Sequence, residues 1–306
     1  MAYEPDYRTK QKFVSEQLST HVSLIRYANL FFIETEINGD PHRLMLDFGA
    51  QGLVLDHNKF PDLKFYPIDF ATINNQKIKG VRIYLENLHF NGITFSDVEG
   101  YTMPMTHAKK LNGFEFSGVL GVSVLEDFEI EVDLINQSLV MHAVDKQGQR
   151  INPYSQPNNI SEGTYVMPFS YANNLLLLEA DVAGKNLRFG LDTGAEVSVL
   201  DQRMNKKVKE HIQITSNVKA TGASGSVRVV EAGQIPSLHF YDVVKVECLP
   251  AVVMPLQGIE ASYGVLLDGL LGYDFFAKGK FTFNFKKRTV VLEPHEDQYF
   301  FCDVLS

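Results

Sequence analysis

The 306 residues, 45% hydrophobic and 21% charged, have the composition of a globular protein that is long enough for two domains. The net charge of −9 argues against a nucleic-acid partner, because phosphate binding requires clustered lysines and arginines. No stretch approaches the ~20 apolar residues of a membrane-spanning helix, and the polar start lacks the apolar core of a secretory signal. We therefore expect no membrane span, and a protein that is either cytoplasmic or exported with its signal removed.

Most of the predicted elements are short strands, separated by Gly, Asn and Pro. In chain order they cover residues 31–37, 43–46, 81–85, 129–134, 175–182, 227–230, 243–248 and 280–285. Asn38-Gly39 is typical of a hairpin turn. Helical patterns are short, near residues 201–209 and after Gly121 and Gly272. The sequence therefore predicts an all-β fold.

Histidines and cysteines lack the spacing of a metal site. The nine histidines form no HxH or HExxH motif, and Cys248 and Cys302 are too few for a disulfide framework. We therefore expect no metal and no other cofactor, and two inert thiols.

The chain repeats itself with a period close to half its length. Residues 33–50 match residues 178–195, and the match places Asp47 on Asp192. Further along, residues 118–125 match residues 269–276 without gaps. Two blocks in the same order in both halves indicate a duplicated lobe.

The repeat sets the expected domain organisation. Residues 146–163 are polar, with Pro and Asn, and form the natural linker. The other parts are an N-terminal extension (1–20), a first lobe (21–145), a second lobe (164–296) and a C-terminal tail (297–306). Because both lobes lie in one chain, we expect a monomer.

Each half places one aspartate directly after an apolar strand and before a glycine turn. Asp47 precedes Gly49, and Asp192 precedes Gly194. Glycine allows the backbone to bend sharply and to approach other groups closely. An isolated aspartate near a glycine is usually a turn residue, but a matched pair in a duplicated lobe predicts two carboxylates with a common task.

Residues 191–195, Leu-Asp-Thr-Gly-Ala, and 270–272, Leu-Leu-Gly, resemble the active-site loop and supporting ψ-loop of retropepsin-like and pepsin-like aspartic proteases. The run at 268–276 resembles bacterial members that carry two retropepsin-like lobes in one chain. The resemblance covers residues 21–295. It implies two homologous β-barrel lobes related by a pseudo-twofold axis, with an active-site cleft between them.

The resemblance also implies the site residues and the chemistry. Asp47 and Asp192 would be the catalytic pair, acting on a peptide or protein substrate through a water held between them. One carboxylate would take a proton from the water, and the other carboxyl would donate to the peptide oxygen. The loop residues implied as support are Phe48, Gly49, Ala50, Thr193, Gly194, Ala195, Gly121 and Gly272.

Two segments midway between the matched blocks are candidate flaps over a substrate. The second segment is rich in glycine, and the first has Asn-Asn as its expected turn. The residues are Asn74 and Asn75 in the first lobe, and Gly222, Ala223, Ser224 and Gly225 in the second. The alternative is an ordinary surface hairpin, and the position within the repeat favours the flap.

The first loop departs from the family at Phe48, where the second loop has Thr193. In the family, two Thr hydroxyls bond across the pseudo-twofold axis to the opposite loop. Phe48 has no hydroxyl, which predicts an asymmetric site with reduced activity. The alternative is an inactive pseudoprotease that acts as a peptide-binding module. Ala50 and Ala195 match retropepsins and lack the hydroxyl that lowers the carboxyl pKa in pepsins, so we expect a weakly acidic to neutral working pH.

Other acidic residues are expected to be structural. Asp56 and Asp201 occupy matched positions and are predicted helix N-caps. Glu129, Glu131 and Asp133 alternate along one predicted strand, which indicates a solvated face.

Overall fold

The computed structural model describes residues 12–64, 66–71, 77–105, 113–152, 163–221 and 227–295, and these residues form mainly strands. Each of the eight predicted runs coincides with a strand or part of one, to within one residue at its ends. The all-β prediction is confirmed.

The first half of the chain forms one large sheet. Its strands are β3 (Ile25–Tyr27), β4 (Leu30–Ile37), β5 (Asp40–Leu46), β6 (Leu53–Asp56), β7 (Tyr66–Ala71), β8 (Lys77–Phe90), β9 (Ile93–Met103) and β10 (Gly118–Leu120). They pair in the order β3-β4-β5-β10-β6-β9-β8-β7, and β1 (Lys12–Phe13) pairs with β9. Because β4 also pairs with β8, the sheet closes on itself as a barrel.

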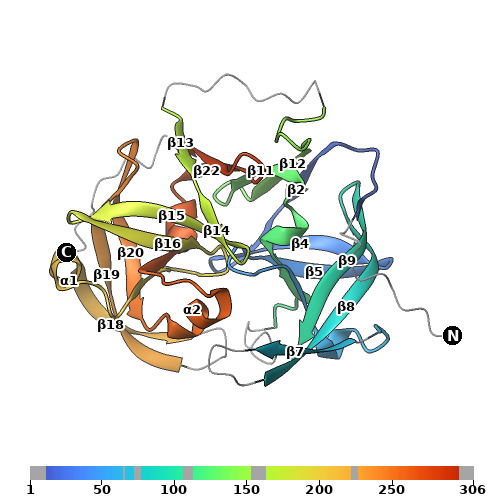
Figure 1. The fold of residues 1–306 in the computed structure, drawn as a ribbon, viewed down its shortest axis with the longest axis horizontal. Helices are drawn as coiled ribbons and strands as arrows, with labels where there is room; N and C mark the ends of the chain where they lie inside the picture. Colours follow the sequence, from blue (N-terminus) through green and yellow to red (C-terminus); the bar gives the residue numbers. More distant parts are fainter. Residues whose placement is uncertain are drawn as a thin grey trace.

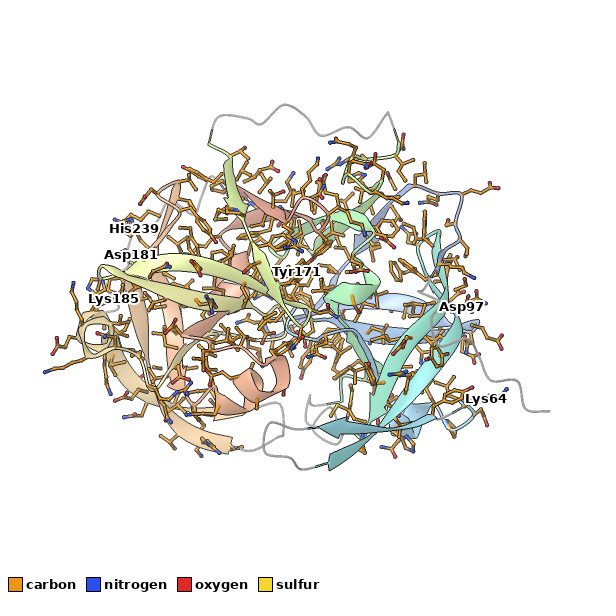
Figure 2. All side chains as sticks on the ribbon, viewed as in Figure 1. Lys64, Asp97, Tyr171, Asp181, Lys185 and His239 are labelled. Atoms are coloured by element: carbon orange, nitrogen blue, oxygen red, sulfur yellow. The ribbon has the colours of Figure 1, made fainter. Side chains whose placement is uncertain are left out.

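The second half repeats this arrangement strand for strand (Figure 1). Its strands are β14 (Ser170–Ala172), β15 (Leu175–Val182), β16 (Lys185–Leu191), β17 (Ser198–Asp201), β18 (Gln213–Thr221), β19 (Val227–Phe240), β20 (Val244–Met254) and β21 (Gly269–Leu271). The order is β14-β15-β16-β21-β17-β20-β19-β18, which is the order of the matched strands in the first half. The closing pair, Asp181 with His239, lies at the outer end of the lobe in Figure 2. The prediction of two homologous lobes is confirmed.

A third sheet takes three strands from each half of the chain. Its members are β2 (Ser19–Ser23), β11 (Phe128–Asp133), β12 (Ser138–Ala143), β13 (Tyr165–Pro168), β22 (Gly279–Asn284) and β23 (Thr289–Pro294). The order is β13-β23-β22-β11-β12-β2, so the halves meet where β11 and β22 pair, with Ile130 opposite Phe283. Figure 1 shows this sheet lying across the two lobes.

In the part of the chain that the structure describes, helices are few and short. They are η1 (His57–Lys59), η3 (Val122–Val124), α1 (Lys206–His211), α2 (Gln257–Tyr263) and α3 (Tyr273–Phe276). Four of them lie at or beside expected positions, but α2 was not predicted. None of the helices in the described part of the chain is long and apolar enough to cross a membrane.

The two matched aspartates that end β6 and β17 hold different segments. Asp56 is the N-cap of η1 and accepts a hydrogen bond from the backbone N of Asn58 at 3.2 Å, as expected. Asp201 instead accepts from Arg203 N at 2.6 Å and from Leu256 N at 3.2 Å, so it fixes a turn and the entry to α2.

Cys248 lies in β20, between Glu247 and Leu249, where the pairing of β19 with β20 is interrupted. It is disulfide-bonded. The expectation of an inert thiol at this position is therefore wrong.

The acidic residues of β11 do not form a solvated face. Arg150 donates to Glu129 at 2.6 Å and to Glu131 at 2.7 Å. His142 Nε2 and Lys280 Nζ lie 3.3 and 3.5 Å from the carboxylate oxygens of Glu131. Since β11 is an inner strand of the third sheet, its charged side chains are withdrawn from water and need partners.

Glu131→Gln is expected to lower the free energy of unfolding at pH 7 by about 3 kcal/mol. The hydrogen bond with His142, together with Arg150 and Lys280, lowers the pKa of Glu131 to about 2. Because this pKa lies below the ordinary value, the carboxylate contributes its full stability above about pH 4.5 and loses it as the pH falls towards 2. Urea unfolding from pH 7 to pH 2 measures the difference between variant and parent.

Glu34→Gln is the matched control, because Glu34 pairs with Arg43 at 2.9 Å on the surface. It should cost less than about 1 kcal/mol at any pH. A difference for Glu131→Gln that stays constant down to pH 2 would contradict the assignment of this stability to the charged carboxylate.

Candidate active site

Asp47 and Asp192 occupy equivalent turns at the ends of β5 and β16. Their backbone N–H groups donate to Leu120 O and Leu271 O, each at 3.0 Å, on the parallel strands β10 and β21. Each carboxylate then accepts a hydrogen bond from the glycine two residues on, at 2.7 Å from Gly49 N and 2.9 Å from Gly194 N. This local bond is the turn chemistry that aspartate favours, and it fixes the direction of each carboxylate.

The two turns bring the carboxyls together. A Cβ added to Gly49 would lie 2.5 Å from Cγ of Asp192, and one added to Gly194 would lie 2.6 Å from Cγ of Asp47. Only glycine permits this approach. Each loop therefore provides one carboxyl and, at its glycine, the space for the carboxyl of the other loop.

Burial raises the pKa of both carboxyls, and the charge of the partner adds to this effect for Asp47. Burial, followed by the charge of Asp192 and the hydrogen bond with it, raises the pKa of Asp47 well above its ordinary value. Burial also raises the pKa of Asp192, against hydrogen bonds from Asp47, Gly194 and Ala195 that lower it. The carboxyls therefore titrate as one unit, and a single shared proton is retained to a higher pH than an isolated aspartate would hold it.

Thr193 joins the second loop to the first. Its buried hydroxyl accepts a hydrogen bond from Phe48 N at 3.0 Å and donates one to Leu46 O at 2.9 Å. It therefore binds the backbone on both sides of Asp47. The ring of Phe48 is fully buried, edge-on to Phe276 and Phe283 with centroids 5.9 and 5.1 Å away. Phe48 therefore contributes packing where a threonine would contribute a hydroxyl.

The glycines of the second repeated block support these loops from below. A Cβ on Gly121 would lie 2.4 Å from Ala50 O, and one on Gly272 would lie 2.7 Å from Ala195 O. Within the loops, Ala50 N and Ala195 N donate back to the aspartate carbonyls at 3.1 and 3.2 Å. The structure thus brings together the predicted aspartates and all of the predicted supporting residues.

Two asparagines that sequence reasoning missed make matched contacts between the lobes. Asn29 Nδ2 donates to Glu196 O at 3.1 Å, and Asn174 Nδ2 donates to Gln51 O at 3.2 Å. Each of these carbonyls lies four residues after the aspartate of the opposite lobe. The signal that could have found them is an asparagine directly before a leucine in two similar segments, Tyr-Ala-Asn-Leu at 27–30 and Tyr-Ala-Asn-Asn-Leu at 171–175.

Tyr263, also missed, is the last residue of α2 and is 8% exposed. Its hydroxyl donates to Gly49 O in the first loop. Burial, and then the charges of Asp47 and Asp192, raise the pKa of the phenol, so it stays protonated and able to donate. The repeat gives no hint of this residue, since the corresponding position of the first half is Asn112.

The candidate flap residues Asn74, Asn75 and 222–225 lie outside the described residues. Up to these gaps, β7 pairs with β8 as far as Ala71 opposite Lys77, and β18 pairs with β19 as far as Thr221 opposite Val227. The strands are those of two hairpins at matched positions in the lobes, and the flap role stays a prediction.

Comparison with known proteins agrees with the geometry. A family model described as aspartyl protease matches residues 33–124 and, separately, residues 178–275. Each match contains one aspartate loop and its supporting glycine. No curated protein gives a significant match to the chain. With one match in each lobe and more than half of its length covered, the chain belongs to the aspartyl protease family.

Proposed function

We propose that this chain is an aspartic endopeptidase in which Asp47 and Asp192 activate a water molecule for peptide hydrolysis. The observation that carries the proposal is the mutual approach of the two carboxyls, each of which faces the glycine of the opposite loop. Two carboxyls this close share one proton, so one of them can donate a proton while the other can accept one.

The chemistry follows from the shared proton. The ionised carboxyl takes a proton from the water as its oxygen attacks the peptide carbonyl, and the protonated carboxyl donates to the carbonyl oxygen. The resulting tetrahedral intermediate breaks its C–N bond when the amine nitrogen receives a proton from the carboxyl that took one from the water. The other carboxylate takes back a proton from a hydroxyl of the intermediate as the carboxyl product forms, so the pair again holds one proton. Asp47 and Asp192 complete this cycle without a covalent intermediate.

The substrate class is a peptide or a protein in an extended conformation. Strand-forming hairpins on both lobes favour peptide binding by backbone hydrogen bonds. Both aspartates belong to one chain, so a monomer contains the whole pair.

Hydrolysis is expected to be fastest at weakly acidic to neutral pH. The working form is the pair with one proton, which exists between the two apparent pKa values. Burial raises both pKa values, and Ala50 and Ala195 offer no side-chain hydroxyl to lower them, so this window moves upward.

Cleavage of a diverse peptide mixture from pH 3 to pH 8, read by mass spectrometry, tests both the activity and this window. The double variant Asp47→Asn/Asp192→Asn is the control for contaminating proteases. A profile that peaks below about pH 3 would be inconsistent with the raised pKa values.

A peptide-binding pseudoprotease is the second candidate, and Phe48 is the observation that favours it. Only the second loop supplies a hydroxyl to the brace between residues 48 and 193, so the pair is held less symmetrically than in the family. Absence of cleavage at every pH, with peptides still retained by the wild-type protein, would favour this function.

A further inference from the structure

Tyr263 reaches from the second lobe to the loop that carries Asp47. Its ring packs in an apolar cluster with Leu256, Leu267 and Leu270, and its hydroxyl donates to Gly49 O. A phenylalanine would fill the same apolar site. What the hydroxyl adds is therefore the contact with the other lobe.

The helix that carries Tyr263 is fixed at its start and at its middle. Leu256 N, at its start, donates to the buried carboxylate of Asp201 at 3.2 Å. Glu260, inside the helix, accepts from Leu267 N at 3.0 Å and pairs with Arg203 at 2.7 Å. These bonds hold α2 to the second lobe, so that lobe sets most of the position of the hydroxyl. The first loop adds one contact to the helix, from Gln51 Nε2 to Ser262 O at 3.2 Å.

Gly49 is the point at which this contact meets the aspartate pair. Its N–H donates to Asp47 Oδ1 at 2.7 Å, and its Cα faces the carboxyl of Asp192. Its carbonyl is held by Tyr263. A shift of this one residue would therefore change the surroundings of both carboxyls.

Thr193 and Tyr263 divide the first loop between them. Thr193 holds Leu46 and Phe48, the two neighbours of Asp47, and Tyr263 holds Gly49. Both hydroxyls come from the second lobe and both act on the loop of the first. Tyr263 thus provides a second hydroxyl that bonds to the first loop, whereas Phe48 has no hydroxyl to bond to the second.

We propose that Tyr263 is a positioning residue whose hydroxyl fixes Gly49 and, through it, the placement of the Asp47 and Asp192 carboxyls. The inference rests on the proposed hydrolysis for its kinetic consequences, but the placement of the carboxyls can be measured without substrate. Tyr263 does not need to touch the substrate for this role.

Tyr263→Phe is expected to lower kcat at least tenfold and to leave KM within about twofold, because misplaced carboxyls slow the chemical step more than they weaken binding. A looser Gly49 also weakens the N–H bond to Asp47, which raises the lower apparent pKa of the pair and moves the acidic limb of the pH–rate profile upward. Tyr241→Phe is the matched control. The Tyr241 hydroxyl accepts from a backbone N–H, that of Glu179 at 3.2 Å, outside the aspartate loops. A Tyr263→Phe profile that matches that of Tyr241→Phe would overturn the inference.

A titration separates the failure of this inference from the failure of the proposed function. The carboxyl carbons of ¹³C-labelled aspartate are followed by NMR against pH, with the pair identified by the signals lost in Asp47→Asn and in Asp192→Asn. An upward shift of the lower apparent pKa in Tyr263→Phe, but not in Tyr241→Phe, supports the inference even if the wild-type protein cleaves no peptide. Identical titrations in the wild type and Tyr263→Phe overturn it even if the wild-type protein is an active protease.

Discussion

Asp47→Asn and Asp192→Asn, made singly, are each expected to lower kcat/KM by a factor of about 10³ or more. Asparagine has the same shape as aspartate and can still accept the turn bond from Gly49 or Gly194. It can neither take a proton from water nor hold the shared proton of the pair. The change therefore removes the chemistry and leaves the loop, and steady-state kinetics on the best peptide from the mixture measures the loss.

The same substitutions should make the fold more stable at neutral pH. A carboxyl whose pKa is raised by folding contributes stability while it is protonated and loses it as the pH rises through the pKa. Near pH 7 the ionised, buried carboxyl of the pair therefore lowers the free energy of unfolding, and a neutral asparagine would not. Both variants should unfold at a higher urea concentration than the wild type, which is opposite in sign to the effect of Glu131→Gln.

Asp181→Asn is the matched control for the aspartate variants. Asp181 also lies at the end of a strand, one residue before the last residue of β15, and accepts a backbone hydrogen bond from Gly184 N at 2.9 Å. Unlike the pair, it lies at the outer end of the second lobe (Figure 2). It should leave both kcat/KM and the urea midpoint close to the wild-type values. If either Asp47→Asn or Asp192→Asn kept more than about a tenth of the activity, the proposed roles of the pair would be wrong.

The repeat explains why so much of the site could be predicted from the sequence. Two copies of one lobe place Asp47 and Asp192 at equivalent strand ends, and Gly121 and Gly272 at equivalent supports. Because strand pairing depends on the alternation and length of apolar runs, both copies fold with the same strand order. The site residues inside the two matched blocks were therefore found.

The comparison of one half with the other does not reveal features that occur once or that form between the halves. Tyr263 has no tyrosine counterpart in the repeat, since the matched position is Asn112. The alternating acidic residues of β11 have the pattern of a surface strand, but in the sheet shared by both halves they are shielded from water and form ion pairs. Their partner Arg150 belongs to no sequence motif. Phe48 was identified as an exception, but its fit against Phe276 and Phe283 depends on contacts with the other half of the chain.

Gly49→Ala and Gly194→Ala are each expected to lower kcat/KM by about 10²-fold or more while the protein still folds. The added methyl would lie 2.5 to 2.9 Å from the carboxyl atoms of the opposite aspartate, whereas carbon atoms in contact are ordinarily about 3.5–4.0 Å apart. The carboxyl must therefore move by about 1 Å, and a misplacement of that size costs about 10²-fold in rate. Kinetics with the same peptide, and urea unfolding to confirm the fold, measure the effect.

Gly258→Ala is the matched control, because a Cβ at this position in α2 would have nothing within 4 Å. It should keep full activity and gain up to about 1 kcal/mol of stability, since alanine favours a helix over glycine. Full activity in either Gly49→Ala or Gly194→Ala would show that the carboxyls are not as close as the loops place them.

The double variant Gly49→Ala/Gly194→Ala sharpens the argument, because both methyls act on the same separation between Asp47 and Asp192. Independent effects would multiply, whereas two changes to one distance should cost much less than the product of the single losses. Turnover separates the two candidate functions here. A protease should lose turnover in all three variants and keep its peptide affinity, because only the placement of the carboxyls has changed, whereas a binding module would have no turnover to lose.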